Sequence, residues 1–168
     1  MSVGDKYFEH ANRLFKKGEW IEAIKEYENI IRLDEKYIGA YINMGLCYSL
    51  LGDIPASRSL YIQAIRVDPE NFISYYNLGL SYFDNKEYEN AAIELSYSSK
   101  LAPNNYNSCK ILGTSYALID KFHKAYQTSF RLLLLKPFSI DSYITGLKIF
   151  SICFFRASSN YFRPSNRK

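Results

Sequence analysis

The sequence predicts an all-α solenoid built from antiparallel helix pairs, because landmark residues recur along it at a constant interval of 34 positions. Four series keep this interval, the last with one slot missing: Pro69, Pro103 and Pro137; Gly45, Gly79 and Gly113; Tyr48, Tyr82 and Tyr116; and Tyr7, Tyr41, Tyr75 and Tyr143. Two further sets of positions at the same interval hold residues of one type. Ala23, Ser57, Ala91 and Ala125 are all small, and Trp20, Ile54, Tyr88 and Phe122 are all large and apolar. Unrelated series do not share one interval by chance, so the chain is predicted to stack equal units.

The interval divides the chain into one domain and a tail. The domain is expected to span 4–155, with repeats at 4–37, 38–71, 72–105 and 106–139 and a terminal helix at 140–155. A chain of 168 residues with 48% apolar residues is long enough for one sizeable core. Residues 156–168 carry four basic side chains and no acid, and they are predicted to form a disordered basic tail.

Within each repeat the first helix is predicted from the spacing of its landmark residues. In the third repeat Tyr75, Leu78, Gly79 and Tyr82 fall at i, i+3, i+4 and i+7, which places them on one helical face. A glycine in a helix costs about 1 kcal/mol relative to alanine. We therefore expect a neighbouring backbone to approach closely at Gly79 and at its equivalents in the series.

Prolines mark where the second helices end and where one of them begins. The residue before a proline is pushed out of helical geometry, so Pro69, Pro103 and Pro137 are each expected to follow a helix end. Pro55 differs because it lies two residues after Asp53, where an N-cap carboxylate and a first-turn proline both favour a helix start. The second helix of the second repeat is therefore predicted to begin here.

The order of these landmarks resembles that of the tetratricopeptide-repeat (TPR) family. The third repeat shows the family pattern of an aromatic residue, Leu-Gly, Tyr, Ala and Pro as Tyr75, Leu78-Gly79, Tyr82, Ala91 and Pro103. The resemblance covers nearly the whole chain and weakens in the terminal repeats, which have only one neighbour. It implies a TPR solenoid, a right-handed superhelix whose first helices line a concave groove.

The resemblance also implies which residues would line that groove and bind a partner protein. They are Phe8, Asn12, Phe15, Ile42, Leu46, Leu50, Ile73, Tyr76, Leu80, Phe83, Lys110 and Thr114. Ile42, Leu46, Leu80 and Phe83 are expected to form an exposed apolar stripe that favours an apolar or amphipathic segment of the partner. The alternative is that these side chains serve only internal packing.

A ligand with a free carboxylate fits this groove poorly. Family members that grip such a ligand use lysine, arginine and asparagine at fixed positions. Asn12 and Asn43 match the asparagines, whereas Phe8, Ile73 and Asn77 occupy the cationic positions. The carboxylate clamp is therefore predicted to be absent.

The sequence does not predict an enzyme or a nucleic-acid binder. It contains no metal, nucleotide or nucleophile motif, and the two histidines, His10 and His123, lie in different repeats, so no catalytic residue, cofactor or metal is expected. The net charge of +4 comes from the tail, which leaves a neutral body without the basic surface that nucleic acids require. Three widely spaced cysteines and no signal-peptide pattern predict reduced thiols and a cytoplasmic protein.

The terminal helix at 140–155 is apolar nearly all round in its second half. Ile149, Phe150, Ile152, Phe154 and Phe155 cannot all face the fourth repeat. Self-association through this helix, contact with a membrane surface, and an altered last repeat each fit the pattern. A membrane span is not expected, because it needs about 20 apolar residues and a lysine interrupts this shorter run.

Together these features predict a protein–protein interaction module that acts as an adaptor or scaffold. One alternative is a chaperone that shields an apolar segment of a client. Another is a non-catalytic subunit of an enzyme or secretion complex.

Overall fold

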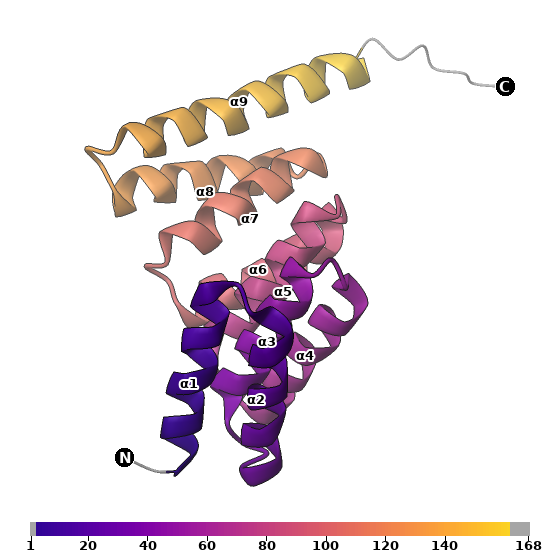
Figure 1. The fold of residues 1–168 in the computed structure, drawn as a ribbon. Coiled ribbons are helices and arrows are strands. Elements are labelled where there is room, and N and C mark those ends of the chain that lie inside the picture. Colours follow the sequence, from indigo (N-terminus) through magenta and orange to yellow (C-terminus); the bar gives the residue numbers. More distant parts are fainter. Residues whose placement is uncertain (1–2, 162–168) are drawn as a thin grey trace, which may run out of the picture. The chain divides into compact units, whose positions relative to one another are not determined.

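A computed structural model describes residues 3–161, and throughout this range the secondary structure is α-helical without a strand (Figure 1). The helices are α1 (Val3–Lys17), α2 (Trp20–Leu33), α3 (Ile38–Leu50), α4 (Ile54–Val67), α5 (Phe72–Asp84), α6 (Tyr88–Leu101), α7 (Tyr106–Leu118), α8 (Phe122–Leu135) and α9 (Ile140–Tyr161). The predicted all-α repeat fold is therefore confirmed, with a helix pair in each of the four repeats.

The chain divides into two compact units, at residues 1–81 and 82–168. Unit 1 contains α1 to α4 and most of α5, and unit 2 contains the end of α5 and α6 to α9. The sequence predicts a single domain, and its interval of 34 gives no sign of this division.

The turn between the two helices of each repeat has the same backbone geometry. Its central residue has a positive φ angle, at 82° for Gly18, 84° for Gly52, 64° for Lys86 and 60° for Asp120. Around Gly52, the Gly52 N–H donates to the carbonyl of Ser49 at 3.1 Å and the next N–H donates to that of Tyr48 at 2.9 Å. This pair of bonds is a Schellman motif, which satisfies the last carbonyls of the first helix.

Helix ends lie where the prolines and capping residues place them. The helices α4, α6 and α8 end two residues before Pro69, Pro103 and Pro137, as predicted. The Asp53 carboxylate accepts a hydrogen bond from the Ala56 N–H at 3.0 Å, so the predicted start of α4 is also confirmed. At the start of α7, the Asn105 side chain accepts in the same way from the Ser108 N–H at 2.9 Å.

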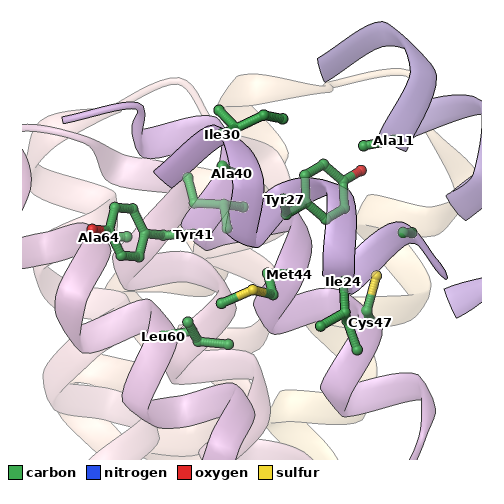
Figure 2. Close-up of a cluster of buried hydrophobic side chains, with 12 residues drawn as sticks. Ala11, Ile24, Tyr27, Ile30, Ala40, Tyr41, Met44, Cys47, Leu60 and Ala64 are labelled. Carbon is green, nitrogen blue, oxygen red and sulfur yellow. The ribbon is translucent and has the colours of Figure 1, made fainter. Parts of the chain in front are cut away.

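The core of unit 1 lies between α1, α2, α3 and α4, where the labelled side chains converge (Figure 2). Tyr27 and Ile30 of α2 are fully buried there. The prediction that a neighbouring backbone lies close to these glycines is corrected at Gly45 of α3, because the group that lies close is a side chain. A Cβ on Gly45 would lie 2.6 Å from the Tyr61 ring of α4. An alanine at this position would therefore collide with Tyr61.

The core of unit 2 joins α7, α8 and α9. Its buried residues include Cys109 and Ala117 of α7, Ala125 and Leu132 of α8, and Ile149 and Cys153 of α9. At Gly113 of α7 an added Cβ would lie 2.9 Å from Ile149 and 3.2 Å from Thr128, so the glycine makes room for both neighbouring helices. In unit 2 the terminal helix is thus an integral packing element.

The terminal helix is longer than predicted. It continues beyond Phe155 to Tyr161, so residues 156–161 are helical instead of disordered. Arg156 accounts for part of this extension, because its guanidinium donates to the Asp120 carboxylate at 2.6 Å. The rest of the predicted tail, 162–168, lies outside the described residues.

Candidate protein-interaction surface

The residues predicted to line a groove belong to four first helices in two units. Those of unit 1 are Phe8, Asn12 and Phe15 of α1, Ile42, Leu46 and Leu50 of α3, and Ile73, Tyr76 and Leu80 of α5. Those of unit 2 are Phe83, at the end of α5, and Lys110 and Thr114 of α7. Nine of the twelve residues thus belong to the same compact unit.

A small polar network connects α1, α2 and α3. The side-chain oxygen Oδ1 of Asn12 accepts hydrogen bonds from the Tyr27 hydroxyl at 2.6 Å and from the side-chain amide of Asn43 at 2.8 Å. Burial raises the pKa of Tyr27 to about 12, so its phenol remains a hydrogen-bond donor at neutral pH. The two asparagines that match the clamp of related repeats are therefore bonded to each other in this chain.

Phe8 takes part in packing at the position where a clamp would need a cation. Its ring centroid lies 5.0 Å from that of Tyr37 and 5.9 Å from that of Tyr27. A Cβ on Gly39 would lie 3.0 Å from the same ring, so the start of α3 approaches Phe8 closely. These aromatic contacts pack α1 against α2 and the start of α3, and Phe8 itself supplies no positive charge.

Ile42 is buried, with 7% of its surface exposed, so the prediction that it belongs to an exposed stripe is wrong. Its helix packs against α1, α2 and α4, and Ile42 itself belongs to the core of unit 1. Leu46, like Phe15 of α1, is half-buried against the same core. Leu80 is also half-buried, so the stripe is less exposed than the sequence implies.

Two of the predicted groove residues in unit 1 expose substantial apolar surface. Leu50, the last residue of α3, is 52% exposed, and Ile73 in the first turn of α5 is 41% exposed. Leu51, which follows Leu50, is 44% exposed and was not predicted. Among the predicted groove residues of unit 1, the most exposed apolar side chains thus lie at the end of α3 and the start of α5.

The predicted residues of unit 2 make internal contacts. The Lys110 ammonium donates to both oxygens of Asp141 in α9, at 2.8 and 3.0 Å, and the Tyr106 hydroxyl donates to the same carboxylate at 3.0 Å. The Lys110 and Tyr106 hydrogen bonds hold the pKa of Asp141 below its ordinary value. The Thr114 hydroxyl donates to the Lys110 carbonyl at 3.0 Å. Lys110 therefore joins α7 to α9.

Two shallow depressions in unit 1 escaped the sequence prediction. One, of about 380 Å³, is lined by Tyr7, Asn29, Arg32 and Leu33, and the other, of about 300 Å³, is lined by Glu28, Ile31, Arg32, Tyr41, Met44 and Gln63. Most of their residues belong to second helices or to the face of α3 that packs on them. The resemblance implies binding residues on the opposite face of the first helices, so it does not predict either depression.

The described residues contain no group of three His, Cys, Asp or Glu side chains placed to hold a metal ion. No helix in the described range is long and apolar enough to cross a membrane. The imidazole of His10 lies 3.8 Å from the carboxylate of Glu26, and that of His123 lies 2.9 Å from the side-chain amide of Gln127. Each histidine thus contacts a residue of its own repeat.

Comparison with protein families identifies the repeats. Two family models, described as tetratricopeptide repeat and TPR repeat, match residues 50–105 and 11–52 respectively. Together they span more than half of the chain. The matched regions contain the Gly, Tyr and Pro landmarks of the second and third repeats.

Curated relatives include an Hsp70-Hsp90 organizing protein of Triticum aestivum, which is 34% identical over 103 residues, or 61% of this chain. Hsp70-Hsp90 organizing protein 1 of Glycine max is 30% identical over 128 residues, or 76% of this chain. The matched regions are 18% and 22% of those proteins, so the chain spans about a fifth of their length.

Solved structures with the same fold include two more distant proteins. MamA 41-end from Desulfovibrio magneticus RS-1 has a TM-score of 0.73 and 19% identity, covering 93% of this chain and 96% of that one. YrrB, described as a TPR protein with an unusual peptide-binding site, has a TM-score of 0.73 and 20% identity, covering 86% of this chain and 75% of that one. At these identities the likeness shows the fold alone.

Proposed function

Because the chain belongs to the tetratricopeptide-repeat family, we propose that it is a protein–protein interaction module that acts as an adaptor or scaffold. Its ligand is an apolar or amphipathic segment of another protein, which docks on the first helices of unit 1. The observation that carries this proposal is the exposed apolar surface of Leu50 and Ile73, which lie on the same helices as the half-buried Leu46 and Leu80.

The chemistry of this surface favours an apolar ligand over an anionic one. The polar groups of Asn12 and Asn43 are bonded together, and Phe8 and Ile73 stand where a carboxylate ligand would need cations. A segment that buries apolar side chains against Leu50 and Ile73 gains about 25 cal/mol for each Å² removed from water. Much of that gain is offset by lost rigid-body freedom, so modest affinity is expected.

A second candidate function is a co-chaperone role. It is favoured by the curated relatives, which are named Hsp70-Hsp90 organizing proteins. In this version the bound segment belongs to a chaperone or to its client, and the module keeps the apolar segment out of water. The two candidates share the same surface and differ in the partner that supplies the segment.

The proposal is tested by measuring peptide binding to a variant with a charged surface. Leu50→Lys combined with Ile73→Lys places two charges on the proposed surface, and both side chains are exposed enough to be replaced without opening the core. The full chain is applied to an immobilised peptide library that contains apolar, amphipathic and acidic carboxy-terminal sequences. We expect the wild type to retain apolar or amphipathic peptides and the double variant to lose at least tenfold in affinity.

The matched control is Ile21→Lys on α2, where the isoleucine is 56% exposed. It introduces one lysine in the same unit, on a second helix outside the proposed surface, and circular dichroism should show equal helicity in all three proteins. The proposal is refuted if the double variant binds as well as the wild type, or if Ile21→Lys weakens binding equally. Selective retention of acidic carboxy-terminal peptides would also refute it, because the ligand would then be anionic.

A further inference from the structure

The terminal helix α9 has the register of a first helix of the repeat. Tyr143 stands one interval of 34 beyond Cys109 of α7, and Leu147 stands one interval beyond Gly113. In α7 these positions are buried, and Gly113 lies directly against Thr128 of α8, the second helix of its repeat. Within the described residues no helix follows α9, and its equivalent face is open.

The open face carries an apolar row that we call the α9 stripe, defined as Tyr143, Leu147, Phe150 and Phe154. Each of the four side chains is between 53% and 68% exposed. The opposite face of α9 packs into unit 2 through Ile149, which is fully buried. The positions along α9 thus separate into two faces, one buried in unit 2 and one largely exposed.

Apolar residues of α8 widen this face. The Tyr126 ring of α8 lies 6.0 Å from the Phe150 ring, centroid to centroid. Since α8 and α9 run antiparallel (Figure 1), the later α8 residues Phe130 and Leu134 lie toward the start of the α9 stripe. These two side chains are 64% and 65% exposed. The apolar surface therefore spans both helices.

The extent of this surface is that of a protein interface. An aromatic side chain buries about 150–250 Å², so the α9 stripe with Phe130 and Leu134 presents roughly 700 Å² in total. The largest apolar patch of an ordinary monomer is about 300–600 Å², whereas a standard interface buries about 800 Å² on each partner. A cover of interface size is therefore needed to remove this surface from water.

We propose that the cover is a second copy of the chain, whose α9 stripe packs on this one about a two-fold axis near Lys148 and Ile149. An interface with two-fold symmetry must be complementary to itself. The α9 stripe meets this requirement because its spacings of four, three and four residues read the same in both directions. Tyr143 then lies opposite Phe154 of the second copy, and Leu147 lies opposite its Phe150.

The direction of α9 in the second copy and the charges around the α9 stripe both suit this arrangement. A two-fold axis across α9 makes the two copies of the helix antiparallel, which is the relation between the two helices of every repeat. The α9 stripe itself contains no charged residue, and the flanking charges Asp141 and Arg156 already pair with Lys110 and Asp120. The α9 of the second copy therefore packs antiparallel on this one without burying an unpaired charge from the stripe.

The dimer is tested by measuring molar mass with light scattering over a range of concentrations of the full chain. We expect the wild type to reach the mass of a dimer and Leu147→Glu combined with Phe150→Glu to have half that mass with unchanged helicity. The matched control is Ile93→Glu combined with Tyr97→Glu on α6, two exposed apolar residues four positions apart in the same unit, which should stay dimeric. Peptide binding by unit 1 is a separate property, so loss of the dimer and loss of peptide binding are distinguishable.

The two-fold geometry has its own test in disulfide formation. Under mild oxidation, a mixture of Tyr143→Cys and Phe154→Cys chains should form a mixed disulfide, and neither variant alone should form an interchain disulfide as efficiently. The native thiols Cys47, Cys109 and Cys153 are buried and do not compete. The proposal is overturned by a wild type that stays monomeric, by a dimer that survives the Leu147→Glu and Phe150→Glu changes, or by a monomer that binds anionic phospholipid vesicles through this face.

Discussion

At the scale of single residues, the repeat depends on one left-handed backbone position in each interhelix turn. Two of the four turns use glycine, which adopts a positive φ without steric cost, and the other two use Lys86 and Asp120. Asp120 gains an ion pair with Arg156 of α9, which offsets part of its strain. Lys86 has the same turn geometry, since its N–H donates to the Phe83 carbonyl at 2.9 Å. Its Cβ carries a steric cost in the left-handed conformation that glycine would remove.

Replacing Lys86 with glycine should therefore stabilise the protein. A non-glycine residue in the left-handed region costs about 1–2 kcal/mol, and the greater freedom of glycine in the unfolded chain takes back about 0.4–1 kcal/mol. The expected net gain for Lys86→Gly is about 0.5–1 kcal/mol in the free energy of unfolding, measured by urea denaturation. Gly52→Ala, the reverse change at φ 84°, should lose about 1 kcal/mol. Equal stability of the three proteins would show that the turns are not strained.

Single residues also show which part of the candidate surface could be predicted. Leu50 and Ile73 are groove positions that the resemblance implies; both are exposed, and their role in binding stays a prediction. The burial of Ile42 could not be predicted, because it depends on how closely three other helices pack around α3. The bonding of Asn12 to Asn43 has the same origin, since the two residues are far apart in sequence and meet only when α1 packs on α3.

At the scale of elements, α9 is where sequence and structure differ most. The interval of 34 locates its start at Ile140, and the apolar sequence correctly indicates that its side chains cannot all face the fourth repeat. Its end at Tyr161 was not predicted, because basic residues after Phe155 are typical of a solvated tail. The helix continues since Arg156 finds an acidic partner in the turn between α7 and α8, which no local pattern reveals.

The contribution of α9 to unit 2 can be measured by truncating one buried isoleucine. Ile149 is fully buried against α7 and α8, so Ile149→Ala should lower the free energy of unfolding by about 2–5 kcal/mol through lost burial and a new cavity. Ile140→Ala removes the same atoms from a side chain that is 77% exposed, and it should change stability by no more than about 0.5 kcal/mol. Similar small effects of both substitutions would mean that α9 does not pack into unit 2 in solution.

At the scale of the whole molecule, the sequence determines the fold through its period, and the division into units follows from contacts that the period does not encode. Each landmark residue has the same local role in every repeat, which is why the helix pairs could be located from the recurring landmark residues. The boundary at residues 81 and 82 falls inside α5, where Gly79 occupies the same repeat position as Gly45 and Gly113 and so does not set this helix apart. A repeat pattern treats all junctions alike, so it could not identify this one.

The high tyrosine content, together with buried thiols, makes the whole molecule sensitive to alkali. Burial raises the pKa of Tyr27 to about 12 and that of Cys47 to about 11 in unit 1, and it raises the pKa of Tyr116 and of Cys153 in unit 2. These groups are neutral when protonated. Above about pH 9 for thiols and pH 10 for phenols, the unfolded chain loses protons that the folded chain retains, so stability falls as pH rises.

The free energy of unfolding, measured by urea denaturation at several pH values, should thus be steady near neutral pH and decline between about pH 9 and pH 12. Cys47→Ala should be less stable than the wild type at pH 7, because the buried side chain becomes smaller, yet its stability should fall less steeply between pH 9 and pH 11. That difference in slope isolates the thiol from the tyrosines. If wild-type stability stays constant up to pH 11, or if the variant declines in parallel with it, the buried groups do not keep their protons in the folded state.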